Sequence, residues 1–116
     1  MYNELKPFYR AEVAAALEAE VLGDFPLAFT HLERAHILSQ RFTLAHVATH
    51  LRMLTLGWRT RNVREVWGQL TRALAALLFS RIWIPVGNTG RANVSAIAPM
   101  PIPEDLVQVL ARVNNR

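Results

Sequence analysis

Two blocks of the sequence repeat each other. Residues 23–35 (GDFPLAFTHLERA) and residues 61–73 (RNVREVWGQLTRA) align without a gap, 38 positions apart. Each block opens on a turn residue and a capping side chain, Asp24 or Asn62, after which apolar and small residues recur at helical spacing. Because a repeated unit of this length cannot bury its apolar side alone, the pattern predicts two stacked hairpins of antiparallel helices.

The first block resembles the tetratricopeptide repeat, and the second is a more distant copy. Residues 23–25 form a Gly-Asp-aromatic turn, and the small residues Ala28 and Ala35 stand where two helices touch in that motif. The second block has Arg61 in place of the turn glycine and Val66 in place of the first alanine. The resemblance implies an all-α fold with four main helices in two tetratricopeptide-like hairpins.

Breaks in the helical periodicity set the expected bounds of these helices. We expect the first helix over residues 10–22 and the second from Asp24 to about residue 39. The third is expected to start at a Thr43 cap and to end near residue 58, and the fourth to start near residue 62.

The third and fourth helices each carry an apolar stripe that we expect to face the core. In the third helix the stripe consists of Leu44, Val47, Leu51, Leu54 and Trp58. In the fourth helix it consists of Val63, Val66, Trp67, Leu70, Ala73, Leu74 and Leu77. The three tryptophans, Trp58, Trp67 and Trp83, are expected to seal the hairpins.

The chain changes character after the fourth helix. Residues 84–103 lack helical periodicity and are rich in proline, which predicts an extended tail laid across the helices, covering the apolar side of the fourth. Acidic residues after Pro103 predict a short last helix over residues 104–113. We therefore expect a single helical domain over residues 1–116, with the hairpins in residues 1–83.

Composition excludes several classes of chemistry. The chain has no cysteine, which excludes disulfide bonds, thiolate metal ligands, iron–sulfur clusters and thiol catalysis. Its start shows no signal peptide, and its longest apolar run, residues 73–79, is too short to cross a bilayer. These features predict a cytoplasmic protein with no membrane insertion. Its spacing of polar residues defines no catalytic arrangement.

The net charge of +4 is concentrated in the second part of the chain, where arginines predominate. Such arginines bind phosphate well, but the sequence contains no recognised nucleic-acid module. We therefore favour solvated helix faces over nucleic-acid binding. A segment with glycines and small polar residues, residues 87–95, is expected to be a hydrogen-bonded surface loop rather than an anion cradle.

All four histidines fall within one short stretch. His46 and His50 are four residues apart, so their rings project from the same face of a helix and can chelate one ion. An antiparallel hairpin places His36 about level with His46 and His31 about level with His50. We therefore expect His31, His36, His46 and His50 to bind a divalent transition metal ion such as zinc, copper or nickel. Met53 lies on the same stripe and would favour copper if it reached the ion.

Three alternatives to this site remain open. His36 shares a side of its helix with apolar residues and can be a core histidine bonded to a carbonyl group. The pair Glu33 and His36 has the spacing of di-iron bundles, but no second such pair accompanies it. The third alternative is a helical adaptor that binds a peptide or protein partner, without metal, through a repeat array.

Several segments together resemble a small bacterial family that is known only as a domain of unknown function. They are HLERAHIL at residues 31–38, GNTG at 87–90, ANVS at 92–95 and PMPIP at 99–103. Members of that family are often encoded beside heavy-metal resistance or efflux genes. The resemblance therefore implies a role in metal handling, resistance or sensing. This chain departs from the family pattern at Arg91, where another glycine is expected.

Overall fold

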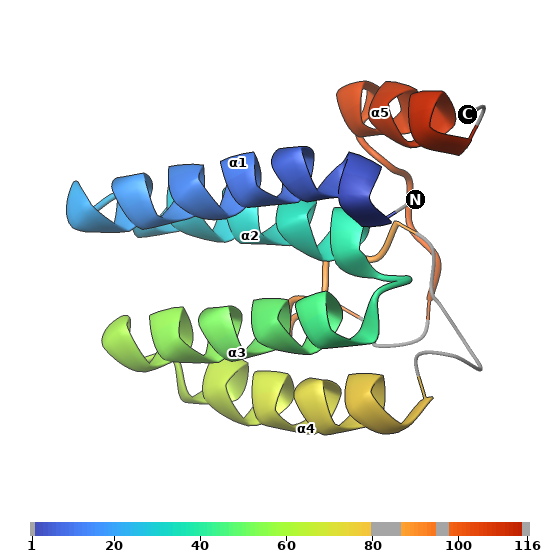
Figure 1. Ribbon diagram of the computed structural model, residues 1–116. Helices are drawn as coiled ribbons and strands as arrows, with labels where there is room; N and C mark the ends of the chain where they lie inside the picture. Colours follow the sequence, from blue (N-terminus) through green and yellow to red (C-terminus); the bar gives the residue numbers. More distant parts are fainter. Residues whose placement is uncertain (1, 80–86, 95–97, 115–116) are drawn as a thin grey trace.

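The computed structural model describes residues 2–79, 87–94 and 98–114 and shows an all-α fold in this part of the chain (Figure 1). The helices are α1 (Tyr2–Val21), α2 (Phe25–Ser39), α3 (Thr43–Arg59), α4 (Val63–Phe79) and α5 (Glu104–Asn114). The predicted fold class is therefore confirmed. None of these helices combines the length and the apolar character that a bilayer span requires.

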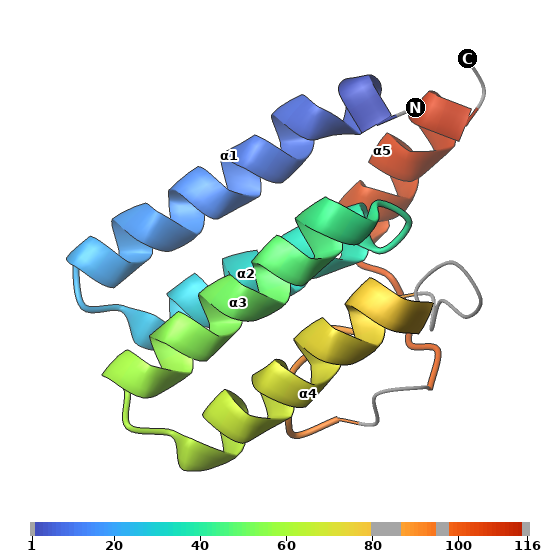
Figure 2. The same cartoon turned by 60° about the horizontal axis from the view of Figure 1, so that its bottom comes forward.

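The first four helices form two hairpins. α1 packs on α2 and α3 on α4, while contacts between α2 and α3 join the hairpins. Figure 2 shows α1 at one edge of this arrangement and α4 at the other. α5 lies against α1 and α2, beside the start of the chain. The closer assignment to the tetratricopeptide class stays a prediction.

The two sequence blocks adopt the same local structure at their turns. Gly23 and Arg61 both have positive φ, 77° and 58°, at aligned positions. Asp24 then accepts a hydrogen bond from the backbone N–H of Leu27, and Asn62 accepts one from the backbone N–H of Glu65. The predicted starts of α2 and α4 are thus confirmed, because a polar side chain satisfies a free N–H group in each first turn.

Two helix starts differ from the prediction. α1 begins at Tyr2 rather than Arg10 and includes Pro7, which removes one hydrogen bond close to the helix start. α3 is preceded by Phe42, whose side chain makes no capping hydrogen bond, so Thr43 is its first residue and not its cap. Phe42 instead packs on the apolar cluster beneath α5, which anchors the chain at this point.

Two apolar clusters hold the hairpins and α5 together. The first joins α1, α2 and α3 through Ala16, Ala19, Ala28, Phe29, Leu32, Met53 and Leu56. The second joins α1, α2 and α5 through Leu5, Ile37, Leu38, Leu106, Val109 and Val113. Both clusters involve the first hairpin, so its apolar face lies inside as the helical pattern predicts.

The second hairpin turns most of its large apolar side chains outward. Leu44, Trp58 and Trp67 are 82%, 73% and 64% exposed, so the prediction that these residues face the core and that these tryptophans seal the hairpins was wrong, whereas Ala73 is buried as predicted. Trp83 lies outside the described residues. Beside small and apolar residues, the buried faces of α3 and α4 carry five polar ones, His46, Thr49, His50, Glu65 and Gln69. A polar face is buried at low cost only where its groups are paired, and most of these groups are.

Where the structure describes it, the tail covers this polar side of α4 and not its apolar side, which corrects the prediction. Ala92 lies against Gly68, where a Cβ atom would come within 2.5 Å of the Ala92 side chain. Arg72 donates hydrogen bonds to the backbone carbonyls of Arg91 and Val94. Arginine bonds to free carbonyl groups therefore hold this extended segment in place.

Candidate metal centre

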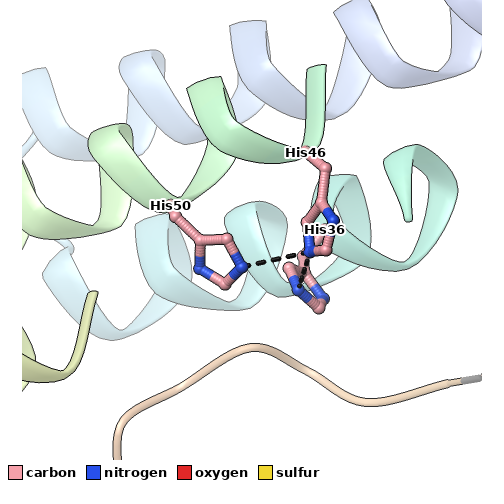
Figure 3. A group of neighbouring side chains, drawn as sticks. All are labelled: His36, His46 and His50. Atoms are coloured by element: carbon pink, nitrogen blue, oxygen red, sulfur yellow. Dashed lines mark hydrogen bonds between the residues drawn. The ribbon is translucent and has the colours of Figure 1, made fainter. Parts of the chain in front are cut away.

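Three histidines meet between the two hairpins. His46 and His50 project from successive turns of α3, as their spacing predicts, and His36 comes from the last turns of α2 (Figure 3). The short connection between α2 and α3 makes the two helices antiparallel, which brings His36 opposite the pair. Their three rings lie with centroids 4.7–4.8 Å apart.

The Nε2 atoms of the three rings converge. Nε2 of His46 is 3.0 Å from Nε2 of His36 and 3.1 Å from Nε2 of His50. A tetrahedral zinc ion with Zn–N bonds of about 2.0–2.1 Å holds its nitrogen ligands about 3.3 Å apart. The two distances from Nε2 of His46 are within a few tenths of an ångström of this spacing, and the ligand atoms of all three histidines lie within 4.8 Å of one another.

Hydrogen bonds to Nδ1 determine the tautomers of His36 and His50. Nδ1–H of His36 donates to the carbonyl oxygen of Asn88 at 2.7 Å. Nδ1–H of His50 donates to Oε1 of Gln69 at 2.5 Å, because the amide group of Gln69 donates to Glu65 and to the carbonyl of Gly90 and so turns its oxygen toward the ring. Both rings carry their proton on Nδ1 and direct an Nε2 lone pair at His46.

His46 cannot satisfy both neighbours. Its Nδ1 is buried and has no hydrogen-bond partner in the part of the chain that the structure describes. A neutral imidazole has one N–H, so Nε2–H of His46 can donate to His36 or to His50, and the lone pair of the other ring then faces a nitrogen that has no second hydrogen to donate. A cation at the meeting point removes this conflict, because all three Nε2 lone pairs can then bind it.

The surroundings keep the three rings neutral. Burial, together with the neighbouring histidines, lowers the pKa of His36 well below its usual value. Burial and the proximity of His50 lower the pKa of His46 to about 4, and burial lowers the pKa of His50 to about 4. Neutral imidazole is the form that binds metal ions, so at neutral pH protons do not compete for these nitrogens.

The tail forms one wall of the site. Figure 3 shows the chain passing beside His36, where Asn88 supplies its carbonyl. Gly90 has a φ of 80°, and a Cβ atom there would come within 2.6 Å of Cδ2 of His36. Gly87, Asn88 and Gly90 are buried, so the prediction of a surface loop was wrong for this first part of residues 87–95. The Asn88 side chain donates to the carbonyl of Ala98 and accepts from the N–H of Gly90, whereas Oγ1 of Thr89 is buried without a hydrogen-bond partner among the described residues.

A partly buried ion network adjoins the histidines through Gln69, which bonds to both His50 and Glu65. Arg91 donates to Glu65 at 2.9 Å and to Glu33 at 3.2 Å, and its guanidinium group stacks on the ring of Phe29. Glu33 is therefore paired with an arginine and does not join the histidines. Among the described residues the candidate metal ligands that lie together are His36, His46 and His50, without a carboxylate. The di-iron alternative lacks its carboxylate ligands here.

The comparisons with known proteins identify a family. A family model described as "Protein of unknown function (DUF3703)" matches residues 3–110, almost the whole chain. The chain belongs to this family. No curated protein and no solved structure is similar enough to count as a match. The match thus confirms the resemblance to a family of unknown function, and the function of this DUF3703 chain has to be argued from its geometry.

His31 lies apart from the other three histidines. Its Nδ1 is 2.8 Å from Oε2 of Glu12 on α1, and Glu12 is paired with Arg34 as well. The reason is rotational: on a helix His31 and His36 point about 140° apart, so one faces α1 when the other faces α3. The structure therefore brings three of the four predicted ligands together and leaves His31 outside.

The repeat explains this difference and points to a residue that the sequence reasoning missed. Glu12 and His31 correspond to His50 and Gln69, each 38 positions later, and each pair bridges the two helices of its hairpin. Applying the repeat spacing to these polar side chains would have predicted the contact between His50 and Gln69. The role of Asn88 carries no such signal, since its backbone makes the contact.

Proposed function

We propose that this protein binds a divalent transition metal ion through the Nε2 atoms of His36, His46 and His50 and acts in metal handling or sensing. The observation that carries the proposal is the convergence of three Nε2 atoms: those of His36 and His50 lie 3.0 Å and 3.1 Å from that of His46. Hydrogen bonds to Nδ1 keep Nε2 of His36 and of His50 unprotonated, so that each can donate a lone pair. Bonding of the second ring nitrogen to a carbonyl or amide oxygen is the usual support of a metal-binding histidine.

The ligand set favours zinc, copper or nickel. Three imidazole nitrogens suit these ions, whereas magnesium and calcium prefer oxygen ligands. The cluster has no carboxylate among the described residues, and the chain has no thiolate. Met53 is completely buried within the apolar cluster of α1, α2 and α3, which supports packing as its role.

The depth of the site favours holding an ion over turnover of a substrate. His36, His46 and His50 are 2%, 7% and 3% exposed, and residues 87–90 cover them on one side. A catalytic metal needs an open position that a substrate can reach. An ion buried beneath the tail instead links α2, α3 and the tail, so binding and the position of the tail are coupled.

The test is a metal analysis followed by titration. Purified untagged protein is analysed for its elements, and the metal-free protein is titrated with zinc, copper and nickel by calorimetry. We expect one ion per chain, and at least a hundredfold loss of affinity in the His46→Ala, His50→Ala double variant. His31→Gln is the matched control and should bind as the wild type does. Wild-type protein that takes up no metal at micromolar concentration would end the proposal.

A further inference from the structure

α4 carries an apolar face that nothing in the described structure covers. Its residues are exposed and recur at helical spacing along α4. We call them the α4 stripe: Val63, Trp67, Leu70, Leu74, Leu77 and Leu78. Trp58 of α3 adjoins its first end, where a mainly apolar pocket is lined by Trp58, Val63, Val66 and Trp67. An exposed apolar face of this extent marks an interaction site.

The repeat indicates what kind of element fits this face. On α2, Phe29, Leu32 and His36 pack against α3. The residues 38 positions later are Trp67, Leu70 and Leu74, which belong to the α4 stripe. The face of α4 that is exposed to solvent therefore corresponds to the face of α2 that packs on α3. We expect the exposed face of α4 to pack on a helix as well.

The charges specify the orientation of a second α4 placed there. The α4 stripe is uncharged, and Arg72 turns away from it toward the carbonyls of the tail. Arg61 and Arg64 give the turn between α3 and α4 a positive charge, whereas the neighbouring Arg59 is paired with Glu20. In an antiparallel pair these cationic ends lie about 25 Å apart, the length of a 17-residue helix and well beyond the Debye length of about 8 Å. A parallel pair would bring them together.

The size of the face suits a stable pair. Together with Trp58, the α4 stripe exposes about 700–900 Å² of mostly apolar surface, close to the roughly 800 Å² that each partner contributes to a standard interface. An apolar helix face is also self-complementary about a twofold axis, since Leu70 can meet Leu70 of the other copy near the axis and Val63 can meet Leu77.

We propose that two copies of this chain pair through their α4 stripes, antiparallel and related by a twofold axis. The metal site takes no part in this contact, because the polar face of α4 that holds Gln69 turns the other way, toward α3 and the tail. The pairing therefore stands independently of metal binding.

The mass of the full-length protein in solution tests the pairing. Light scattering coupled to size exclusion should give twice the chain mass of 13.1 kDa at tens of micromolar. Leu70→Glu and Leu74→Glu place a charge in the interface on both copies and should weaken the dimer at least about a hundredfold. Leu22→Glu, at an exposed leucine outside the α4 stripe, is the matched control and should remain dimeric. Circular dichroism verifies that each variant is folded.

Cross-linking tests the orientation. Because the chain has no cysteine, Val63→Cys and Leu77→Cys each introduce a single thiol, and a mass tag on one chain distinguishes the mixed product. The antiparallel pair predicts a disulfide between Cys variants of positions 63 and 77, since a disulfide needs Cα atoms within about 7 Å. Disulfides within like variants would indicate a parallel pair and overturn the orientation.

Three results would overturn the dimer itself. The first is a monomer at all concentrations up to about 200 µM. The second is a dimer that the two leucine variants leave intact. The third is a monomer that sediments with vesicles of phosphatidylglycerol and phosphatidylcholine in a Leu70-dependent manner, which would assign the α4 stripe to a lipid surface.

Discussion

At the scale of single residues, the site depends on side chains that orient the histidines. Gln69 is completely buried, and its amide group connects His50, Glu65 and the carbonyl of Gly90. It touches no metal ligand atom, so its role is to fix which nitrogen of His50 carries the proton. This makes Gln69 the residue where positioning can be separated from ligation.

Replacing Gln69 by leucine should weaken zinc binding by about 10–100-fold, because Nδ1–H of His50 loses its acceptor and the ring can turn. Calorimetric titration of the metal-free variant measures the change. Gln108→Leu, at an exposed position of α5, is the control and should bind zinc as the wild type does. Wild-type affinity in the Gln69 variant would show that the amide does not position His50.

The histidines show which contacts of the site can be predicted from the sequence and which cannot. The spacing of His46 and His50 predicted their proximity correctly, because an interval of four residues on a helix determines it. The choice between His31 and His36 depended on which side of α2 faces α3, and that is decided by contacts with another hairpin. Gln69 lies 19 residues from His50, and only the 38-residue repeat relates the two. Asn88 lies 52 residues from His36 and makes the contact through its backbone, so no sequence pattern connects them.

At the scale of elements, α3 and α4 are unusual because many of their large apolar side chains are exposed while several of their polar side chains are buried. An apolar stripe normally faces inward because burial of each large apolar side chain contributes about 1.5–3 kcal/mol. Here the inward faces carry polar groups beside small and apolar residues, and these polar groups form hydrogen bonds to the tail and to each other. Buried polar groups without such partners would cost more than the stripes could offset. The tail is thus an integral part of the second hairpin.

The contact of the tail with His36 gives a test at this scale. Gly90→Ala should lower the free energy of unfolding by about 2–4 kcal/mol, since the added Cβ strains a backbone at positive φ and meets the ring of His36. Gly23→Ala is a matched control: its φ is 77°, but nothing lies within 4 Å of the added atom, so about 1–2 kcal/mol is expected. Urea denaturation measures both, and equal losses would contradict a close contact at Gly90.

At the scale of the whole molecule, the buried neutral histidines make the metal-free protein sensitive to acid. Burial lowers the pKa of His46 and His50 from 6.5 to about 4. Between these values the unfolded chain binds protons that the folded chain does not, so the free energy of unfolding falls as the pH drops from 6.5 to 4. Each histidine contributes up to about 1.4 kcal/mol per pH unit in this interval, and nothing above it.

Chemical denaturation of metal-free protein between pH 4 and pH 8 tests this dependence. The His46→Gln, His50→Gln variant should lose less stability over the acidic interval than the wild type, whatever its stability at pH 8. His31→Gln should show the wild-type dependence of stability on pH, because it leaves the buried histidines His36, His46 and His50 unchanged. Parallel slopes in the wild type and the double variant would be inconsistent with neutral, buried rings.

Local sequence patterns predict the number and order of the helices and the proximity of His46 to His50, although they place the start of α1 too late. Periodicity, caps and turn residues act over a few positions, and so the starts of α2 and α4 and the pairing of His46 with His50 follow from neighbouring residues. Which faces are buried was decided by the tertiary structure alone. The polar faces of α3 and α4 are stable inside only because the tail and α2, far away in the chain, supply their hydrogen-bond partners.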